Sequence, residues 1–240
     1  MGNKEELISY LKKVKTIGKE EYQKIAELFE KVVVEDVSEI WKKHKEKINM
    51  RLNDVPVCLE GSAVNSSTAL GFLIEEFLVQ QLSTKEYDKP KESTIASLYD
   101  FKFKMDDKIE LLVNLKVERA GGSNSGICAG NILKNYYSKD NKPKLYLIVK
   151  SGYDINDKKS EVIFNGLSSV YLESFLIKKN MLKSDSRNWS NTFKILSGRL
   201  QLPSKDKLKG VGIIDITNPQ EILSFMNILA EKLTESKKKD

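Results

Sequence analysis

The sequence predicts an α/β fold in which a central mixed β-sheet is flanked by helices, with further helices at the N-terminus. Three observations lead to this prediction. Apolar residues recur at helical spacing through residues 4–14 and 19–34, whereas apolar and polar residues alternate through residues 109–118, as in a strand. Residues 145–150, an apolar run that ends in Lys150, are typical of a strand that is covered on both faces. Helices and strands that follow each other in this way are expected to pack as layers around one core.

Composition and charge restrict the class of protein. The chain has 240 residues, of which 40% are hydrophobic and 31% charged, a balance that suits one sizeable globular domain. It contains no run of about 18 apolar residues that would span a bilayer, and its first residues lack the apolar region of a signal peptide. We therefore expect a cytoplasmic protein with no membrane partner. The net charge of +6 permits binding to a polyanion, although acidic and basic residues are mixed along most of the chain.

Two residue types exclude several kinds of active site. Cys58 and Cys128 lie far apart and neither belongs to a Cys-x-x-Cys pair, so neither a zinc site nor a disulfide framework is indicated. The single histidine, His44, lies in a lysine-rich helical stretch where we expect it at the surface. Nucleases and hydrolases that need a positioned imidazole are therefore not indicated. If the protein is a nuclease, a metal site made of carboxylates and lysine is the chemistry that remains available.

The first third of the chain is predicted to be helical. After the helices at 4–14 and 19–34, a third is expected at about 37–48, with a basic edge that either follows a DNA backbone or is simply solvated. A fourth helix begins near residues 66–68, which provide capping side chains, and has an apolar stripe on one side. Glu75 and Glu76 lie at the two borders of that stripe, so periodicity does not distinguish which of them points inward. Residues 83–97 are polar and are predicted to form a loop.

The central stretch, residues 99–122, is predicted to contain two strands joined by a polar turn at 105–108. Because side chains alternate along a strand, Asn114, Lys116 and Glu118 share the face opposite the aliphatic side chains. Asp100 opens the partner strand near that polar face. Carboxylate and amide oxygens beside a lysine form a candidate site for a divalent cation. The alternative is an ordinary half-exposed strand with a solvated polar face.

The remainder of the chain continues the α/β pattern. Small polar residues fill 120–131, where either a strand-to-helix connection or a loop that approaches phosphates would use the glycines. Strands are predicted at 145–150, 161–164 and 211–216, and helices at 167–180 and 219–233. Only four arginines accompany 36 lysines. Two of them, Arg187 and Arg199, are candidate DNA contacts because guanidinium groups bind guanine and phosphate in a bidentate way, with structural ion pairs as the alternative.

Tyr99-Asp100-Phe101 and Asn114-Leu115-Lys116, on successive strands, resemble the two halves of the PD-(D/E)XK nuclease motif. Tyr99 stands where that family often has proline, and Asn114 stands where it has an acid. The preceding helix is similar to the Gly-x-x-x-Glu helix of many restriction enzymes, with Gly71 matching the glycine and Glu75 the acid. The resemblance covers roughly residues 59–177. It implies a restriction-endonuclease-like sheet and, within the superfamily, a type II restriction endonuclease of a restriction-modification system.

The resemblance also implies roles for particular residues. Mg²⁺ would be held by Asp100, by Asn114 and by a backbone carbonyl near Leu115. Lys116 would stabilise developing negative charge and orient or deprotonate the attacking water, and Glu75 joins this catalytic set. The loop after the lysine strand often faces DNA in such enzymes, which adds a further set of candidate contacts: Ser123, Asn124 and Ser125.

Asn114 leaves three explanations open, because an amide can ligate Mg²⁺ but brings no negative charge. A second acid could come from Glu75, Glu76 or Glu118; the protein could work with an amide; or the site could be disabled, naturally or by substitution. The last case makes the chain a DNA-binding protein without catalysis, and a structure-selective repair nuclease of the same fold is a further alternative.

The resemblance further implies one nuclease domain over 1–240. It would comprise a helical part at 1–58, a catalytic core at 59–177 and a C-terminal part at 178–240 for DNA recognition and dimer contacts. The expected partner is double-stranded DNA, bound by a homodimer, because two-fold symmetric sites match two-fold symmetric proteins.

Overall fold

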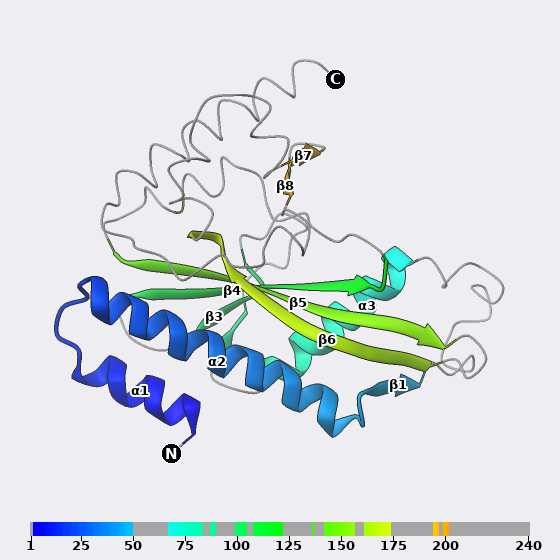
Figure 1. The fold of residues 1–240 in the computed structure, drawn as a ribbon, viewed down its shortest axis with the longest axis horizontal. Helices are drawn as coiled ribbons and strands as arrows, with labels where there is room; N and C mark the ends of the chain where they lie inside the picture. Colours follow the sequence, from blue (N-terminus) through cyan, green and yellow to red (C-terminus); the bar gives the residue numbers. More distant parts are fainter. Residues whose placement is uncertain are drawn as a thin grey trace.

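A mixed six-stranded sheet forms the centre of the computed structural model, which describes residues 2–49, 67–83, 87–89, 99–104, 108–121, 136, 142–156, 161–173, 194–196 and 199–201. Its strands are β1 (Lys47–Asn49), β2 (Tyr87–Asp88), β3 (Phe101–Phe103), β4 (Glu110–Arg119), β5 (Lys144–Asn156) and β6 (Glu161–Tyr171). They lie in the order β1-β6-β5-β4-β3-β2 (Figure 1). The pair β4/β5 is parallel and the other neighbours are antiparallel. The predicted α/β fold with a mixed sheet is confirmed.

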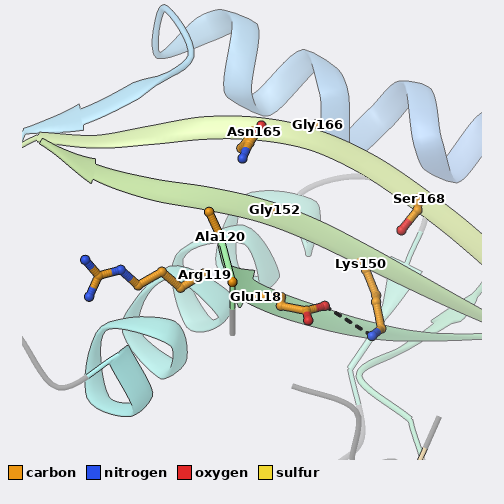
Figure 2. Close-up of a pocket in the computed structure, with 9 residues that line it drawn as sticks. Glu118, Arg119, Ala120, Lys150, Gly152, Asn165, Gly166 and Ser168 are labelled. Carbon is orange, nitrogen blue, oxygen red and sulfur yellow. Dashed lines mark hydrogen bonds and ion pairs between the residues drawn. The ribbon is translucent and has the colours of Figure 1, made fainter. Parts of the chain in front are cut away.

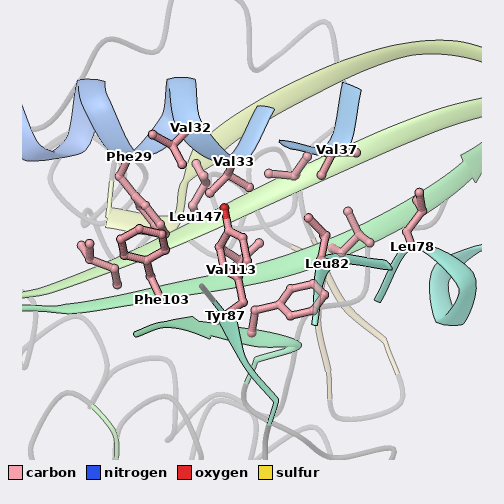
Figure 3. Close-up of a cluster of buried hydrophobic side chains, with 14 of the residues drawn as sticks. Phe29, Val32, Val33, Val37, Leu78, Leu82, Tyr87, Phe103, Val113 and Leu147 are labelled. Carbon is pink, nitrogen blue, oxygen red and sulfur yellow. The ribbon is translucent and has the colours of Figure 1, made fainter. Parts of the chain in front are cut away.

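Three helices accompany the sheet: α1 (Asn3–Lys13), α2 (Lys19–Lys43) and α3 (Ser67–Leu82). The long helix α2 runs along the sheet, with α1 beside it (Figure 1). Its apolar stripe, which includes Phe29, Val33 and Val37, meets Val113 of β4 and Leu147 of β5 in one hydrophobic core (Figure 3). Burial of these side chains, each worth about 1.5–3 kcal/mol, is the main force that holds helix and sheet together. The N-terminal helices thus belong to the same core as the central strands.

The helical region differs from the prediction in one respect. Two helices were expected, at 19–34 and about 37–48, whereas α2 continues without a break from Lys19 to Lys43. The apolar spacing does not stop at residues 35–36, because Asp36 is itself on the buried face of the helix. The chain leaves the helix at Lys45 and Glu46, whose φ angles of 55° and 58° lie in the left-handed region. Residues 47–49 then form β1 instead of a last helical turn.

The buried carboxylate of Asp36 explains how the long helix tolerates an acid in its apolar stripe. The Nζ atom of Lys4 in α1 lies 3.1 Å from Oδ2 of Asp36, and the Tyr87 hydroxyl donates a hydrogen bond of 2.8 Å to the same oxygen. Figure 3 shows the Tyr87 hydroxyl pointing from the sheet edge toward α2. These contacts join α1, α2 and β2. β2 lies within the stretch 83–97, which was predicted to be a loop, so that prediction is wrong at Tyr87–Asp88.

Replacement of Tyr87 by phenylalanine is expected to lower the free energy of unfolding by about 1.5 kcal/mol, because a buried charged acceptor loses a hydrogen bond. Chemical denaturation measures this change. Tyr10→Phe is the matched control, since Tyr10 is half-buried, and it should change stability by less than about 0.5 kcal/mol. Equal effects of the two substitutions would contradict the assigned role of Tyr87.

The two longest strands extend well beyond their predicted limits. β5 continues from the predicted run at 145–150 to Asn156, and β6 continues from 161–164 to Tyr171. The helix predicted to begin at 167 is therefore wrong over residues 167–171, which pair with β5. Helical spacing was present in this segment, but the available strand edge of β5 determines its conformation, as tertiary context commonly does.

A separate two-stranded sheet consists of β7 (Lys194–Leu196) and β8 (Arg199–Gln201), which pair antiparallel. The strand and helix predicted at 211–216 and 219–233 lie outside the described residues. Within the described part of the chain, no helix combines the length and the apolar character needed to cross a bilayer.

Candidate active site

The candidate site forms where β3 begins, at the point beyond which β4 has no further strand partner on that side among the described residues. β3 pairs with β4 only through Phe101 and Lys102, and the Asp100 N–H donates a last hydrogen bond of 2.9 Å to the Val113 carbonyl. The next N–H of β4 on this side belongs to Leu115, and it donates a hydrogen bond of 2.7 Å to Oδ2 of Asp100. The Asp100 side chain thus takes the place that a backbone carbonyl of a neighbouring strand would occupy. The predicted position of Asp100 beside the second strand is therefore observed.

Glu75 reaches the same strand edge from α3. This helix packs against β4, and the Glu75 carboxylate accepts a hydrogen bond from the backbone N–H of Val117. Gly71, one turn earlier, is buried against the strand, and a Cβ at this position would lie 3.9 Å from the Val117 carbonyl oxygen. The backbone N–H groups of Leu115 and Val117 on β4 thus donate to two carboxylates from different parts of the chain, Asp100 and Glu75.

The ammonium of Lys116 attracts both carboxylates. Burial raises the pKa of Glu75 to about 7, the Lys116 charge opposes that rise, and the negative charge of Asp100 adds to it. Burial also raises the pKa of Asp100, again opposed by Lys116 and by the hydrogen bond from Leu115. Glu75 and Asp100 are largely buried and share a single lysine, so keeping both carboxylates ionised costs free energy. An additional positive charge beside them would lower this cost.

Asn114 differs most from its expected environment. It was placed on a polar face that could be solvated, but it is only 2% exposed, and its Oδ1 atom has no hydrogen-bond partner among the described residues. A buried acceptor oxygen without a donor costs free energy, and ligation of a cation would remove that cost. The carbonyl of Leu115 faces the same strand edge as its N–H, because both groups of one residue point the same way in a strand.

These groups fit a hard divalent cation, whose preferred ligands are carboxylate, amide and carbonyl oxygens. Among the described residues, no three histidine, cysteine, aspartate or glutamate side chains gather closely enough to hold a metal ion by themselves. A cation here would therefore use Asp100 and Glu75 together with the neutral oxygens of Asn114 and Leu115.

The structure also distinguishes the three acids that were considered as a second carboxylate. Glu118 shares a face with Lys116, but its Oε2 lies 3.1 Å from Nζ of Lys150 on the neighbouring strand. The Glu76 side chain is 60% exposed and accepts a hydrogen bond of 3.2 Å from Gln80. Only Glu75 among these acids is described as both interacting with Lys116 and accepting a hydrogen bond from the β4 edge.

The predicted DNA contacts are largely untested by the structure. Ser123, Asn124, Ser125 and Arg187 lie outside the described residues, and Arg199 begins β8, where only the backbone is described. Sequence analysis also missed Lys150, which it treated only as the last residue of a buried strand. No periodic signal identifies it, since its position follows from the pairing of Lys116 with Lys150 in the parallel ladder.

Comparison with known proteins gives a weak structural likeness. No family model matches the sequence, and a search of curated proteins finds no match. Among solved structures, the chain is similar to the NlaIV restriction endonuclease, with a TM-score of 0.41 and 16% sequence identity over 72% of this chain and 71% of that chain. The function proposed below depends on the residues described above.

Proposed function

We propose that this chain is a Mg²⁺-dependent nuclease and, more specifically, a type II restriction endonuclease that hydrolyses phosphodiester bonds at one site in double-stranded DNA. The observation that carries the proposal is the meeting of Asp100, Glu75 and Lys116 beside the part of β4 that extends past its pairing with β3. The Oδ1 atom of Asn114 supports it, because this oxygen has no partner within the described part of the chain and a cation can use it.

In this proposal each residue has a distinct task. Asp100 and Glu75 would hold the ion, with the Asn114 and Leu115 oxygens as neutral ligands; the hydrogen bonds from β4 amides fix the two carboxylates before the ion arrives. The bound ion would supply Lewis-acid polarisation of the scissile phosphate. Lys116 would stabilise the charge that develops on the phosphate oxygens and would orient the attacking water.

Incubation of supercoiled plasmid and phage DNA with the purified protein and Mg²⁺ tests the proposal. Asp100→Asn should abolish cleavage, since it keeps the side-chain shape but removes a charged ligand. Asp88→Asn is the matched control, because Asp88 is an exposed strand residue paired with Lys104 at 3.2 Å, and it should cleave like the parent. Discrete fragments would identify a site-specific enzyme, and a smear or structure-dependent cutting would favour a repair nuclease. No cleavage under varied metals and salt would refute the nuclease proposal for this chain.

Asn114→Asp is expected to increase Mg²⁺ affinity by about 10-fold or more, because it adds a negative charge to the ligand set. Calorimetric titration of parent and variant with Mg²⁺ measures this. Asn114 also favours a second candidate function, a DNA-binding protein that does not cleave. Cleavage by Asn114→Asp but not by the parent would support that alternative, and an unchanged metal affinity would show that residue 114 is not a ligand.

A palindromic target would require two copies of the chain, because two-fold DNA symmetry is matched by two-fold protein symmetry. We therefore propose a homodimer as the active form. Sedimentation with and without target DNA measures its mass, and a monomer that cleaves both strands would contradict this part of the proposal.

A further inference from the structure

A hollow of about 280 Å³ lies on the sheet beside the candidate active site. Strands β4, β5 and β6 form it, and its lining includes Glu118, Lys150, Asn165 and Ser168 (Figure 2). Gly152 and Gly166 leave its floor without side chains. Gly152 cannot be larger, because a Cβ there would lie 2.9 Å from the backbone oxygen of Asn165. The hollow is thus built by a close approach of β5 and β6 next to the irregularity in their pairing between Ser151 and Tyr153.

The sheet register aligns this hollow with the candidate catalytic lysine. Lys116 of β4 pairs with Lys150 of β5, and Lys150 pairs with Ser168 of β6. Paired residues on adjacent strands point to the same face and are separated by about 5 Å. Two ammonium groups and a hydroxyl therefore form one row across three strands, and this row begins at the candidate active site.

The hollow presents hydrogen-bond donors that are not used within the described part of the chain. Lys150 is 8% exposed, and Glu118 is the one acceptor it contacts there, although an ammonium group has three donors. No side-chain hydrogen bond of Ser168 or Asn165 is found among those residues either. Figure 2 shows Lys150 directed toward Glu118, while Arg119 extends away from this pair. The charges of Glu118, Arg119 and Lys150 leave the lining with one net positive charge.

We propose that the hollow binds a phosphate group of the nucleic-acid strand that neighbours the phosphate at Lys116. This inference depends on the proposed function for its ligand, but it concerns a separate site with no metal. In the free protein Glu118 neutralises Lys150. A bound phosphate would accept hydrogen bonds from the Lys150 ammonium and the Ser168 hydroxyl, and the negative charge of Glu118 would oppose its binding.

Binding of a short DNA duplex in EDTA tests this site separately from cleavage. Lys150→Gln should weaken binding by about 5- to 10-fold and reduce the slope of log affinity against log salt by about one, whereas Lys150→Arg should retain both. Glu118→Gln should strengthen binding by about 3-fold, because the competing charge is gone. Lys102→Gln is the matched control, since Lys102 pairs with Glu110 at 3.2 Å on an adjacent strand but lies outside the lining.

The opposite signs separate a phosphate site from a purely structural ion pair. Loss of a structural pair would weaken binding in both Lys150→Gln and Glu118→Gln, and this result would overturn the inference. Effects no larger than those of Lys102→Gln would overturn it too, even if the parent cleaves DNA. If the signs are as expected but the parent does not cleave with Mg²⁺, only the nuclease proposal fails. If the parent binds no DNA, both fail.

Discussion

Lys116→Met is expected to reduce the rate of DNA cleavage by about 10²- to 10³-fold, the typical effect of removing one positioned donor from a site where charge develops. Methionine keeps much of the aliphatic length but has no charge. In the structure the Lys116 ammonium lowers the pKa values of both Glu75 and Asp100. The substitution therefore also removes the main attraction that favours ionised carboxylates.

A second measurement separates this role from a loss of folding. The pKa of Glu75, followed by NMR of the metal-free protein, should rise in Lys116→Met above the value of about 7 that burial and its neighbours produce in the parent. Lys104→Met serves as the control, because Lys104 is exposed and pairs with Asp88. If Lys116→Met leaves the Glu75 titration and the cleavage rate as they are in Lys104→Met, Lys116 is not part of the site.

Glu75→Gln is expected to stabilise the metal-free protein in a pH-dependent way. Burial raises the pKa of Glu75 from 4.5 to about 7, so the folded protein holds this proton more tightly than the unfolded chain does. The contribution of Glu75 to stability is therefore most favourable below its unfolded pKa and is lost as the pH rises through about 7. Glutamine stays neutral and can still accept the Val117 hydrogen bond. The variant should exceed the parent by about 2 kcal/mol near pH 8, and by much less near pH 5.

Urea unfolding at both pH values measures the difference. Glu76→Gln is the matched control, because Glu76 is the next residue of α3 and largely exposed; its effect should stay within about 0.5 kcal/mol. Mg²⁺ should raise the unfolding midpoint of the parent more than that of Glu75→Gln, since binding to the folded state alone is stabilising. A Glu75→Gln protein that is less stable than the parent at about pH 8 would contradict the assigned environment.

The sequence alone determined the main elements of the fold. The alternation in 109–118 identified β4 and its two faces, because a period of two is a local property of the strand. The apolar stripe of α3 was readable for a similar reason, whereas residues 105–107 of the predicted turn lie outside the described residues. The motif also placed Asp100 close to Lys116, and the structure shows this proximity, since both residues lie on two strands that follow each other in the sequence. By contrast, the predicted ends of α2, β5 and β6 were wrong. Helix α2 continues through Asp36 because Lys4 of α1 pairs with this buried acid. Strands β5 and β6 are longer than predicted because each pairs along the other, and such tertiary pairing overrides the local pattern.

Only the tertiary structure distinguished Glu75 from Glu76 and Glu118. Glu75 and Glu76 border the same helical stripe, and the choice between them depends on how α3 rotates against β4. Glu118 shares a face with Lys116, but the parallel pairing of β4 with β5 brings Lys150 to it instead. The row of Lys116, Lys150 and Ser168 has the same origin, since its members come from three strands far apart in the chain. Sequence periodicity fixes which face of its own element a side chain occupies, whereas register and helix rotation, which depend on distant packing, decide which side chains meet.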